Sequence, residues 1–416
     1  MRDRGYYTIG EVIISQSPFV AVPNVYEESP ESKCEWCFSS SNIKACSACH
    51  AVWYCSTTCQ NFPTTDTDNS KLVEALGSHM SDVDQKQLVN YTQMAALVNA
   101  ILQWPASEIN MKDIAENFSK LSCNSHTIID SQLLAIGTGL YPVISLTNHS
   151  CVPNSVLLFE GRLAVIRAME HMPKDTEVLT SYIDTAGSTV TRQKALKEKY
   201  FFTCSCPRCI KLGQPDDIRE TAILEGYRCK DSCCDGFLLC GSDNKGFVCQ
   251  KCGLVLSNKE LSTITNELKC ISDKASVSLS SGRKSEASVA YKRIEKLQLK
   301  LYHPFSISIM RTRETLLKIS MELMDFKGAH SYCISVIQIY ERVYPKCHPL
   351  LGLHYYLCGQ IEMLMGEKKT TVESLKKAYN IFRITHGTKT PFTMELKTKL
   401  DEARAMASLG RMKIKS

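Results

Sequence analysis

Apolar and polar residues alternate near the start of the chain in the way that short strands require. Residues 7–24 are rich in β-branched and aromatic side chains and are interrupted at Gly10 and Pro18, so this segment is predicted to form short strands. Residues 136–183 alternate apolar stretches with turn-forming residues, which predicts several more strands joined by irregular turns. We expect the second segment to form the β core.

Helical periodicity dominates the segment between those strands. From Lys71 to about Lys120, apolar side chains recur at the spacing of one helix face, and Pro105 breaks the pattern. The apolar positions are Leu72, Leu76, Leu88, Met94, Leu97, Val98 and Ile101. This segment is predicted to be a small helical lobe inserted into the β core.

The chain after about Leu261 is predicted to be helical and contains a weak repeat. Residues 302–304 (Tyr-His-Pro) recur as residues 347–349 (Cys-His-Pro), and each is followed by an apolar helical pattern. Small-residue hinges at 327–329 and 365–367 are expected to separate two helices in each unit. The pattern predicts two or three helical hairpins of the tetratricopeptide type, whose concave face would suit an extended peptide or a partner helix. A plain α-helical bundle that only supports the β core is the alternative.

Bulk composition limits the class of protein. A chain of 416 residues exceeds one ordinary core, so two or three lobes are expected. With 44% hydrophobic and 22% charged residues and no apolar run of about 18 residues, no membrane span is predicted. The first ten residues carry charges and tyrosines where a secretory signal would be apolar. The net charge is +6, and the lysines and arginines are interspersed with acidic residues rather than gathered into a long run. Direct nucleic-acid binding is therefore not expected.

Cysteine is unusually frequent and unevenly placed. The chain has 21 cysteines, and 17 of them lie between Cys34 and Cys252. Without a secretory signal, such clustering indicates metal binding rather than disulfides. The remaining cysteines stand alone in helical patterns and are predicted to be buried core thiols. These are Cys270, Cys333, Cys347 and Cys358.

Three cysteine sets have the spacing of zinc ligands. A two-residue gap lets two thiolates reach one tetrahedral zinc at about 2.3 Å, so paired C-x2-C motifs are a strong signal. The first set is Cys34, Cys37, Cys46, Cys49, Cys55 and Cys59; the second is Cys204, Cys206 and Cys209; the third is Cys229, Cys234, Cys249 and Cys252. The second set needs a fourth ligand. The third has a zinc-ribbon pattern, in which Cys233 competes with Cys234 for one position, and its four thiolates predict a structural role.

The order of these segments resembles that of the SET-and-MYND protein-lysine methyltransferases, and most closely their plant branch. The resemblance covers most of the chain and includes the Asn-His-Ser-Cys loop at 148–151, the Ser-Tyr-Ile stretch at 181–183 and the cysteines from Cys204. It implies an α+β fold with a SET-type β core, an inserted zinc finger and helical lobe, a post-SET zinc site and a tetratricopeptide-like C-terminal domain. The implied boundaries are the N-terminal part of the SET core at 1–33, a partial MYND-type finger at 34–62, a helical SET insertion at 63–120, the SET core at 121–203, a post-SET motif at 204–212, a zinc-ribbon-like segment at 220–256 and the C-terminal domain at 261–416.

The resemblance also implies how the cysteines share zinc. Cys34, Cys37, Cys55 and Cys59 would hold one ion, and Cys46 with Cys49 would begin a second. A MYND finger ends in a His-x3-Cys pair, which this chain lacks after Cys59, so we expect one complete zinc site and one weak or empty half-site. Cys151 would be the fourth ligand of the post-SET trio, and a self-contained zinc knuckle with another nearby cysteine is the alternative.

For chemistry, the resemblance implies transfer of a methyl group from S-adenosylmethionine to a lysine of a histone or non-histone protein. An in-line displacement depends on positioning, and a desolvated aromatic channel favours loss of the proton from a lysine whose aqueous pKa is about 10.4. By resemblance, Tyr182 is the catalytic residue and also lines the lysine channel and contacts the cofactor; Tyr200 and Phe202 line the lysine channel or cover the cofactor; and Asn124, Asn148 and His149 contact the cofactor. His126, where relatives often carry an aromatic residue, is expected to be structural.

One departure from the family favours a second hypothesis. Relatives begin with a glycine- and arginine-containing turn that grips the cofactor, and here only Arg2, Arg4 and Gly5 are available as substitutes. Loss of one charge-assisted contact costs about 1.5–3 kcal/mol. The alternative is therefore a weak or inactive zinc-stabilised scaffold that binds partners. Zinc-finger binding to DNA is not favoured, because no basic recognition helix accompanies the cysteines. We expect a monomer in the nucleus, the cytoplasm or both.

Overall fold

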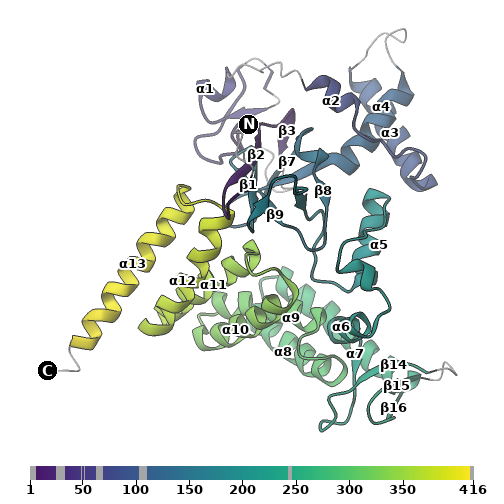
Figure 1. Ribbon diagram of the computed structural model, residues 1–416, viewed down its shortest axis with the longest axis vertical. Coiled ribbons are helices and arrows are strands. Elements are labelled where there is room, and N and C mark those ends of the chain that lie inside the picture. The colour runs from purple at the N-terminus through teal and green to yellow at the C-terminus, as the bar shows by residue number, and fades with distance from the viewer. Residues whose placement is uncertain are drawn as a thin grey trace. The chain divides into compact units, whose positions relative to one another are not determined.

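The structure is a computed structural model that describes residues 6–24, 33–47, 49–50, 52–61, 69–102, 110–241 and 246–412. The chain divides into two compact units (Figure 1). The first comprises Met1–Tyr182, Ala195–Thr203 and Ile384–His386, and the second comprises Ile183–Lys194, Cys204–Arg383 and Gly387–Ser416. Arg2, Arg4 and Gly5, the expected substitutes for the cofactor-binding turn, lie outside the described residues.

The first unit is built on short strands that form several small sheets. The sheet orders are β2-β10-β9, β3-β7-β6, β1-β11, β12-β8 and β4-β5, and all pairs are antiparallel except β12 with β8. The strands are β1 (Tyr6–Tyr7), β2 (Val12–Gln16), β3 (Val20–Pro23), β4 (Lys44–Ala45), β5 (Trp53–Tyr54), β6 (Ser125–Ile129), β7 (Ala135–Leu140), β8 (Asn148–His149), β9 (Ser155–Glu160), β10 (Leu163–Ala168), β11 (Met172–Pro173) and β12 (Leu179–Thr180). The prediction of a β core from two strand-rich segments is confirmed.

The zinc-finger segment is packed directly onto this β core. The ring of Phe38 is buried with Ile128 and Tyr141, where β6 and β7 meet. A Cβ atom at Gly137 would lie only 2.5 Å from that ring, so glycine is required there for the close approach. Arg162 adds a second connection, since its guanidinium lies 4.2 Å from the centre of the Trp36 ring and donates to the Trp36 carbonyl over 2.8 Å.

The helical lobe contains α2 (Ser70–Glu74), α3 (Gln85–Leu102) and α4 (Met111–Asn124), which lie together beside the strands (Figure 1). Helix α4 runs past residue 120, where the sequence placed the end of the insertion, and it leads directly into β6. The predicted break at Pro105 lies outside the described residues. The apolar stripe that predicted α3 is largely exposed, with Leu88, Met94, Leu97 and Ile101 on the surface, while Tyr91 and Ala95 pack with α4. The remaining short helices of the unit are α1 (Thr57–Gln60) and the 3-10 turn Ile144–Leu146.

The second unit contains a small four-stranded antiparallel sheet, which follows helix α6 and is followed by long helices. The sheet order is β13-β14-β15-β16, with β13 (Tyr227–Arg228), β14 (Phe237–Cys240), β15 (Gly246–Cys249) and β16 (Val255–Ser257). The helices are α6 (Pro215–Leu224), α7 (Asn258–Ser280), α8 (Lys284–Leu301), α9 (Ile307–Glu322), α10 (Phe326–Val343), α11 (Pro349–Leu364), α12 (Lys368–Thr385) and α13 (Pro391–Met412), and α5 (Thr189–Tyr200) crosses the boundary between the units. None of the helices in the described parts of the chain is long and apolar enough to cross a bilayer.

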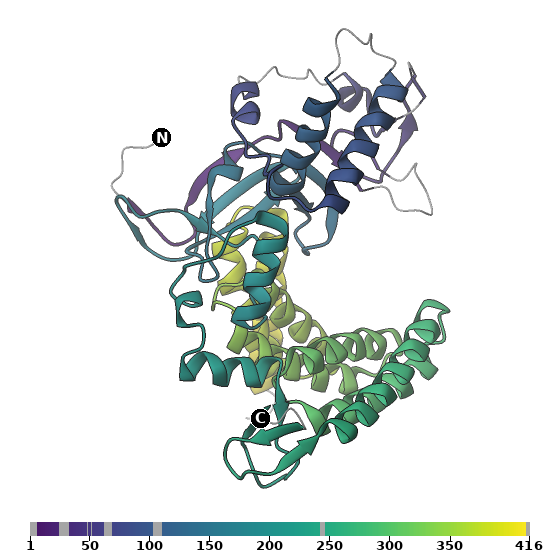
Figure 2. The same ribbon diagram turned by 90° about the vertical axis from the view of Figure 1, so that its right-hand side faces the viewer.

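Consecutive helices of the second unit pack as hairpins, as the repeat predicted. Helix α7 packs with α8, α8 with α9, α9 with α10 and α10 with α11, so the hairpins form a series (Figure 2). Gly352 and Gly359 let α11 approach α12 closely, because a Cβ at Gly359 would lie 2.7 Å from Leu375. The two His-Pro repeats have the same local structure: Nδ1 of His303 accepts from the amide two residues later over 3.2 Å, and Nδ1 of His348 does so over 3.3 Å.

Two details of the C-terminal prediction are corrected. The expected hinge at 327–329 lies inside the first turn of α10, and the helices separate at 323–325, because Asp325 caps α10 by accepting from Gly328 N over 3.0 Å. The expected hinge at 365–367 is correct, and Gly366 adopts the left-handed φ of 79° that ends a helix. Of the cysteines predicted to be core thiols, Cys333 and Cys358 are buried, whereas Cys347 is half-buried and Cys270 is exposed.

Candidate functional site

A parallel strand pair brings the two most diagnostic motifs of the sequence together. Strand β8 contains Asn148 and His149, and it pairs with β12, which ends immediately before Ser181 and Tyr182. The Ser150 amide continues the pairing by donating to the Thr180 carbonyl over 2.9 Å. The 148–151 loop and the 181–183 stretch are therefore neighbours in space because of backbone hydrogen bonds.

The imidazole of His149 is held by the protein at both ring nitrogens. Nδ1 accepts a hydrogen bond from the Tyr182 amide over 3.0 Å, and Nε2 lies 3.3 Å from the sulfur of Cys151. Any contact of this residue with a cofactor must then use its ring face or its backbone.

Tyr182, Tyr200 and Phe202 pack together, and we call these three residues the aromatic group. The ring centres of Tyr182 and Tyr200 are 5.0 Å apart, and the ring of Phe202 meets Tyr182 edge to face at 6.3 Å. The His149 ring lies 5.2 Å from Tyr182 and so extends the same aromatic surface. The sequence placed these side chains in one site, and the structure brings them together.

The backbone at Phe201 explains how two residues of the 200–202 segment reach the same ring. Phe201 has a left-handed φ of 61°, which is uncommon for a bulky residue, and its ring stacks on His79 at 5.3 Å while Tyr200 and Phe202 contact Tyr182. Sequence reasoning missed both Phe201 and His79. No sequence signal marks His79, because only the fold brings the segment before α3 to this turn.

Hydrogen bonds fix the hydroxyl groups of the two tyrosines. The Tyr182 hydroxyl donates to the Thr147 carbonyl, and the Tyr200 hydroxyl donates to the Tyr182 carbonyl over 3.3 Å. Burial, reinforced by Tyr200, raises the pKa of Tyr182 to about 12. Tyr182 is therefore protonated near neutral pH and is unsuited to act as a base, but its oxygen retains lone pairs that can accept a hydrogen bond.

The two asparagines each use their amide nitrogen to bind the protein. Asn124 Nδ2 donates to the Lys120 carbonyl over 2.8 Å and to the Gly77 carbonyl over 3.2 Å, and Asn148 Nδ2 donates to Glu177 over 2.6 Å. Among the described residues, neither Oδ1 atom has a hydrogen-bond partner. Each Oδ1 atom is thus a fixed acceptor, the type of group that an ammonium such as that of S-adenosylmethionine requires, and the assignment of the two asparagines to the cofactor stays a prediction.

His126 has the surroundings of a structural residue. Its Nε2 lies 3.3 Å from the Ser145 hydroxyl, and its ring packs edge to face on Tyr141 at 6.0 Å. Burial, with a smaller contribution from Lys199, lowers the pKa of His126 to about 4. A neutral imidazole in this position agrees with the sequence interpretation.

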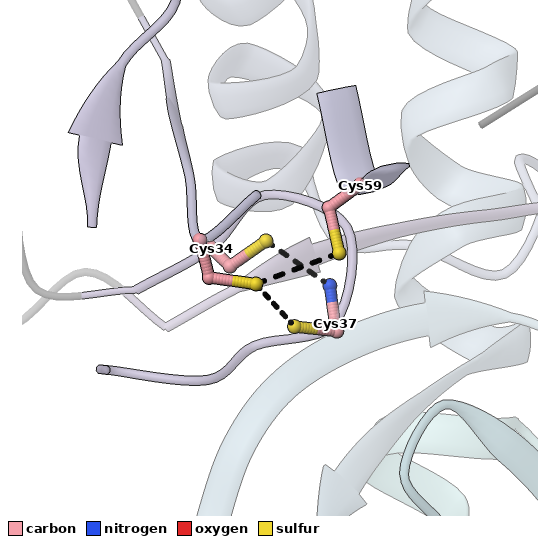
Figure 3. A group of neighbouring side chains, drawn as sticks. Cys34, Cys37 and Cys59 are labelled. Atoms are coloured by element: carbon pink, nitrogen blue, oxygen red, sulfur yellow. Dashed lines mark hydrogen bonds between the residues drawn. The ribbon is translucent and has the colours of Figure 1, made fainter. Parts of the chain in front are cut away.

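The first cysteine set brings four of its six sulfur atoms together. The sulfurs of Cys34, Cys37, Cys55 and Cys59 all lie within 4.8 Å of one another, and Figure 3 shows three of these side chains converging. Cys55 lies 3.5 Å from both Cys37 and Cys59, close to the edge of about 3.8 Å expected between two thiolates 2.3 Å from a tetrahedral zinc. The arrangement suits one zinc ion.

The other two cysteines of that set do not join a ligand group among the described residues. Cys49 is exposed, and the sulfur of Cys46 accepts from Gln60 Nε2 over 3.5 Å. Residues 62–68, which follow the finger, lie outside the described residues. The incomplete second zinc site therefore stays a prediction.

The remaining two cysteine sets also gather their sulfurs. In the ribbon, the sulfur atoms of Cys229, Cys234, Cys249 and Cys252 all lie within 4.8 Å of one another. The sulfurs of Cys204, Cys206 and Cys209 likewise lie within 4.8 Å of one another, and Cys151 as their fourth ligand stays a prediction, because it belongs to the other unit. In the ribbon, Cys229 lies 3.6 Å from Cys252 and Cys234 lies 3.7 Å from Cys249. Cys234 occupies the position for which Cys233 was a competitor, and Cys233 is exposed.

Comparisons with known proteins agree with these features. Residues 34–63 match the MYND finger family. The chain is 49% identical to the histone-lysine N-methyltransferase ASHR1 of Arabidopsis thaliana, over 97% of this chain and 92% of that protein. It is 22% identical to the N-lysine methyltransferase SMYD2 of Gallus gallus, over 95% of this chain and 93% of that protein, and 23% identical to SMYD2 of Homo sapiens, over 95% and 94%.

Proposed function

This chain belongs to the SET and MYND domain family of protein-lysine methyltransferases, and we propose that it transfers methyl groups at the aromatic group around Tyr182. It is a protein-lysine N-methyltransferase that uses S-adenosylmethionine and binds zinc. The observation that most supports this location is the packing of Tyr182 against Tyr200 and Phe202, 5.0 Å and 6.3 Å away.

Cofactor binding is assigned to the groups that flank the aromatic group. The Oδ1 atoms of Asn124 and Asn148 are held in place through their own amide nitrogens, so they would accept from the ammonium group of the cofactor without losing further side-chain freedom. Phe202 and the face of His149 would pack against its apolar parts. When bound, the cofactor supplies a methyl group activated by a positively charged sulfur.

The target lysine must present an unprotonated amine. Aromatic walls remove water from the lysine side chain, and desolvation lowers the pKa of an ammonium group. The Tyr182 oxygen would accept a hydrogen bond from the amine and so orient its lone pair, because the Tyr182 proton is directed at the Thr147 carbonyl. Tyr182 does not take up the proton, which leaves to solvent before the transfer. The rate of methyl transfer then depends more on the alignment of the amine with the methyl group than on acid–base catalysis.

Two variants separate the contribution of the Tyr182 hydroxyl to catalysis from that of the rest of the aromatic group. Tyr182→Phe keeps the ring, and we expect kcat to fall by about 10²-fold while the Kd for S-adenosylmethionine is unchanged. Tyr200→Phe is the matched control and should show a smaller fall in kcat, because the Tyr200 hydroxyl donates to the backbone carbonyl of Tyr182. The measurement is transfer of labelled methyl groups to histones and to a protein extract. A Tyr182→Phe enzyme as active as the wild type would exclude Tyr182 as the catalytic residue.

Calorimetric titration with S-adenosylmethionine tests the scaffold alternative. Binding by the wild type that is lost in an Asn148→Ala, His149→Ala double variant supports the cofactor site. No binding by correctly folded wild-type protein would support a scaffold with weak or no activity. Glu177→Gln is the control, because a glutamine carbonyl can still accept from Asn148 Nδ2.

We infer that a histone lysine is the substrate. The support is the relative from Arabidopsis thaliana, which is named a histone-lysine N-methyltransferase and is 49% identical over 97% of this chain. A histone substrate would require residence in the nucleus, and a non-histone substrate would permit the cytoplasm. Methylation of recombinant nucleosomes and of free histones, followed by mass spectrometry, identifies the lysine. A methylated cytoplasmic protein with unmodified histones would contradict the inference.

A second partner is proposed for the C-terminal helices. A cleft of about 640 Å³ lies beside the zinc ribbon and α7 and α8, with an apolar floor that includes Leu256 and Ile264. Its lining also includes the basic residues Arg228, Lys230, Lys259 and Lys300 and the acidic residue Glu260, which pairs with Lys230 over 3.1 Å. The excess of positive charge favours an acidic peptide with an apolar anchor. Fluorescence anisotropy with such a peptide should detect binding that Lys300→Glu weakens and that high salt reduces. Binding that is insensitive to both would contradict this proposal.

A further inference from the structure

We propose that His330, Cys358 and Glu362 form a Zn²⁺ site between helices α10 and α11, in addition to the cysteine sets. His330 lies on α10, and Cys358 and Glu362 lie one turn apart on α11. One ligand atom from each residue falls within 4.8 Å of the others. Pairs of side chains one turn apart on facing helices are a common way to build a metal site in a helical core. From the sequence alone, Cys358 was predicted only to be a buried core thiol.

The distances within this group match a tetrahedral zinc. His330 Nε2 lies 3.2 Å from Glu362 Oε1, and the Cys358 sulfur lies 3.6 Å from the same oxygen. With zinc bonds of about 2.0–2.1 Å to nitrogen, 2.0–2.2 Å to oxygen and 2.3 Å to sulfur, tetrahedral edges are about 3.4 Å for nitrogen to oxygen and about 3.6 Å for sulfur to oxygen. The two distances that involve Glu362 therefore already match those of a bound ion, and the ring nitrogen and the sulfur lie within 4.8 Å of each other.

Burial of Glu362 is the second observation that indicates a cation. This carboxylate is 3% exposed, and His330 is the ionic partner it has among the described residues. Its Oε2 atom is buried without a hydrogen-bond partner in the described part of the chain. A buried carboxylate is costly unless it is fully paired, and a divalent cation would supply the missing positive charge.

The ligand types favour zinc over other common ions. Imidazole, thiolate and carboxylate together suit Zn²⁺, whereas Mg²⁺ and Ca²⁺ prefer oxygen ligands alone. Cys333, one turn after His330 on α10, is not the fourth ligand, since its thiol donates to the His354 carbonyl over 3.5 Å and it lies outside the group. Three protein ligands leave one position for water or another ligand. The His330 side chain is 31% exposed, which gives an ion access from solvent.

An ion at this position would join two neighbouring hairpins. Helix α10 belongs to the α9–α10 hairpin and α11 to the next one, so the ion would stabilise the packing of one hairpin on the other. We expect the site to release its ion more readily than the four-cysteine groups, because it has fewer thiolates and fewer protein ligands.

The test uses the full-length protein after brief treatment with a mild chelator that spares the four-cysteine groups. Calorimetric titration with ZnCl₂ should show one further equivalent bound by the wild type, accompanied by a rise in Tm. His330→Ala is the main variant, because this side chain is partly exposed and its loss leaves the core intact. Glu362→Gln is a second variant that keeps the size of the side chain. Both should lose the additional equivalent and the rise in Tm.

Cys333→Ala is the matched control, and it should bind the additional zinc like the wild type. No additional zinc on the wild type, or equal binding by the wild type and His330→Ala, would overturn the proposal. Loss of binding in Cys333→Ala with retention in His330→Ala would also overturn it. None of these readouts depends on methyl transfer, so the result is independent of the proposed function.

Discussion

The amide of Tyr182 donates a hydrogen bond to Nδ1 of His149 over 3.0 Å, so the proposed catalytic tyrosine and the 148–151 loop are joined by one imidazole ring. The other nitrogen of that ring lies 3.3 Å from the sulfur of Cys151. Because Nδ1 accepts, a neutral His149 carries its proton on Nε2 and can donate it to a thiolate. His149 thus connects the backbone of the aromatic group to a predicted zinc ligand.

Replacing His149 should affect zinc and catalysis together. A His149→Ala variant removes a hydrogen bond to the Cys151 sulfur and the acceptor for the Tyr182 amide. Partners of metal ligands typically contribute 10–100-fold to metal affinity, so we expect faster zinc loss to a chelator and a lower kcat. The measurements are the kinetics of zinc release, followed with a colorimetric indicator, and methyl transfer. A fall in kcat with unchanged zinc release would show that the contact with Cys151 does not support the metal.

The number of tightly bound zinc ions should be three. The structure holds two groups of four sulfurs and the trio of Cys204, Cys206 and Cys209, for which Cys151 is the predicted fourth ligand, while Cys46 and Cys49 join no group among the described residues. Metal analysis of full-length protein, after a mild chelator has removed weakly bound ions, should therefore give about three equivalents per chain. Cys46→Ser should keep this number, and Cys34→Ser should reduce it. Four tight equivalents, or a loss of one ion in Cys46→Ser, would contradict the incomplete MYND finger.

Gly236 should be essential for the zinc ribbon. A Cβ atom at this position would lie 2.5 Å from the Cys249 sulfur and 3.2 Å from the Cys234 sulfur, so Gly236→Ala must push the ligands apart. We expect this variant to bind one zinc fewer. Gly253→Ala in the same ribbon is the control, because its Cβ would meet nothing within 4 Å and would add only backbone strain at a φ of 74°. Equal zinc content in both variants would contradict the prediction.

Acid should destabilise the protein through half-buried histidines. Burial lowers the pKa of His126 and of His348 to about 4 from an ordinary value of 6.5, so the folded state holds both rings neutral. Their contribution is fully present above pH 6.5 and is lost as the pH falls towards 4, with a slope of about 1.4 kcal/mol per pH unit for each group. We expect Tm to fall over this range. His126→Gln, which can still bind Ser145, should show a weaker pH dependence. An identical dependence in the variant would exclude His126 as a cause.

The sequence alone determined the features that depend on local spacing. The two-residue gaps between cysteines direct neighbouring thiolates towards one ion, so the zinc ribbon of Cys229 was predictable from its motif, whereas the family resemblance supplied Cys55 and Cys59 as partners of Cys34 and Cys37. Helical periodicity likewise predicted α3 and the hairpins after residue 261. Resemblance to a family, rather than spacing, supplied Cys151 as a ligand and Tyr182 as the catalytic residue. No local pattern carries information about partners so distant in the chain.

The tertiary structure alone decided which side chains meet. The left-handed turn at Phe201 places this ring on His79, and no motif marks either residue. The apolar residues that predicted α3 are mostly exposed, because helical periodicity identifies a face but not the surface that covers it. The group of His330, Cys358 and Glu362 exists only because α10 packs on α11, which brings together residues from two helices whose separate sequences read as ordinary core. Contacts between distant segments depend on the packing of the whole unit, and spacing along the chain does not encode that packing.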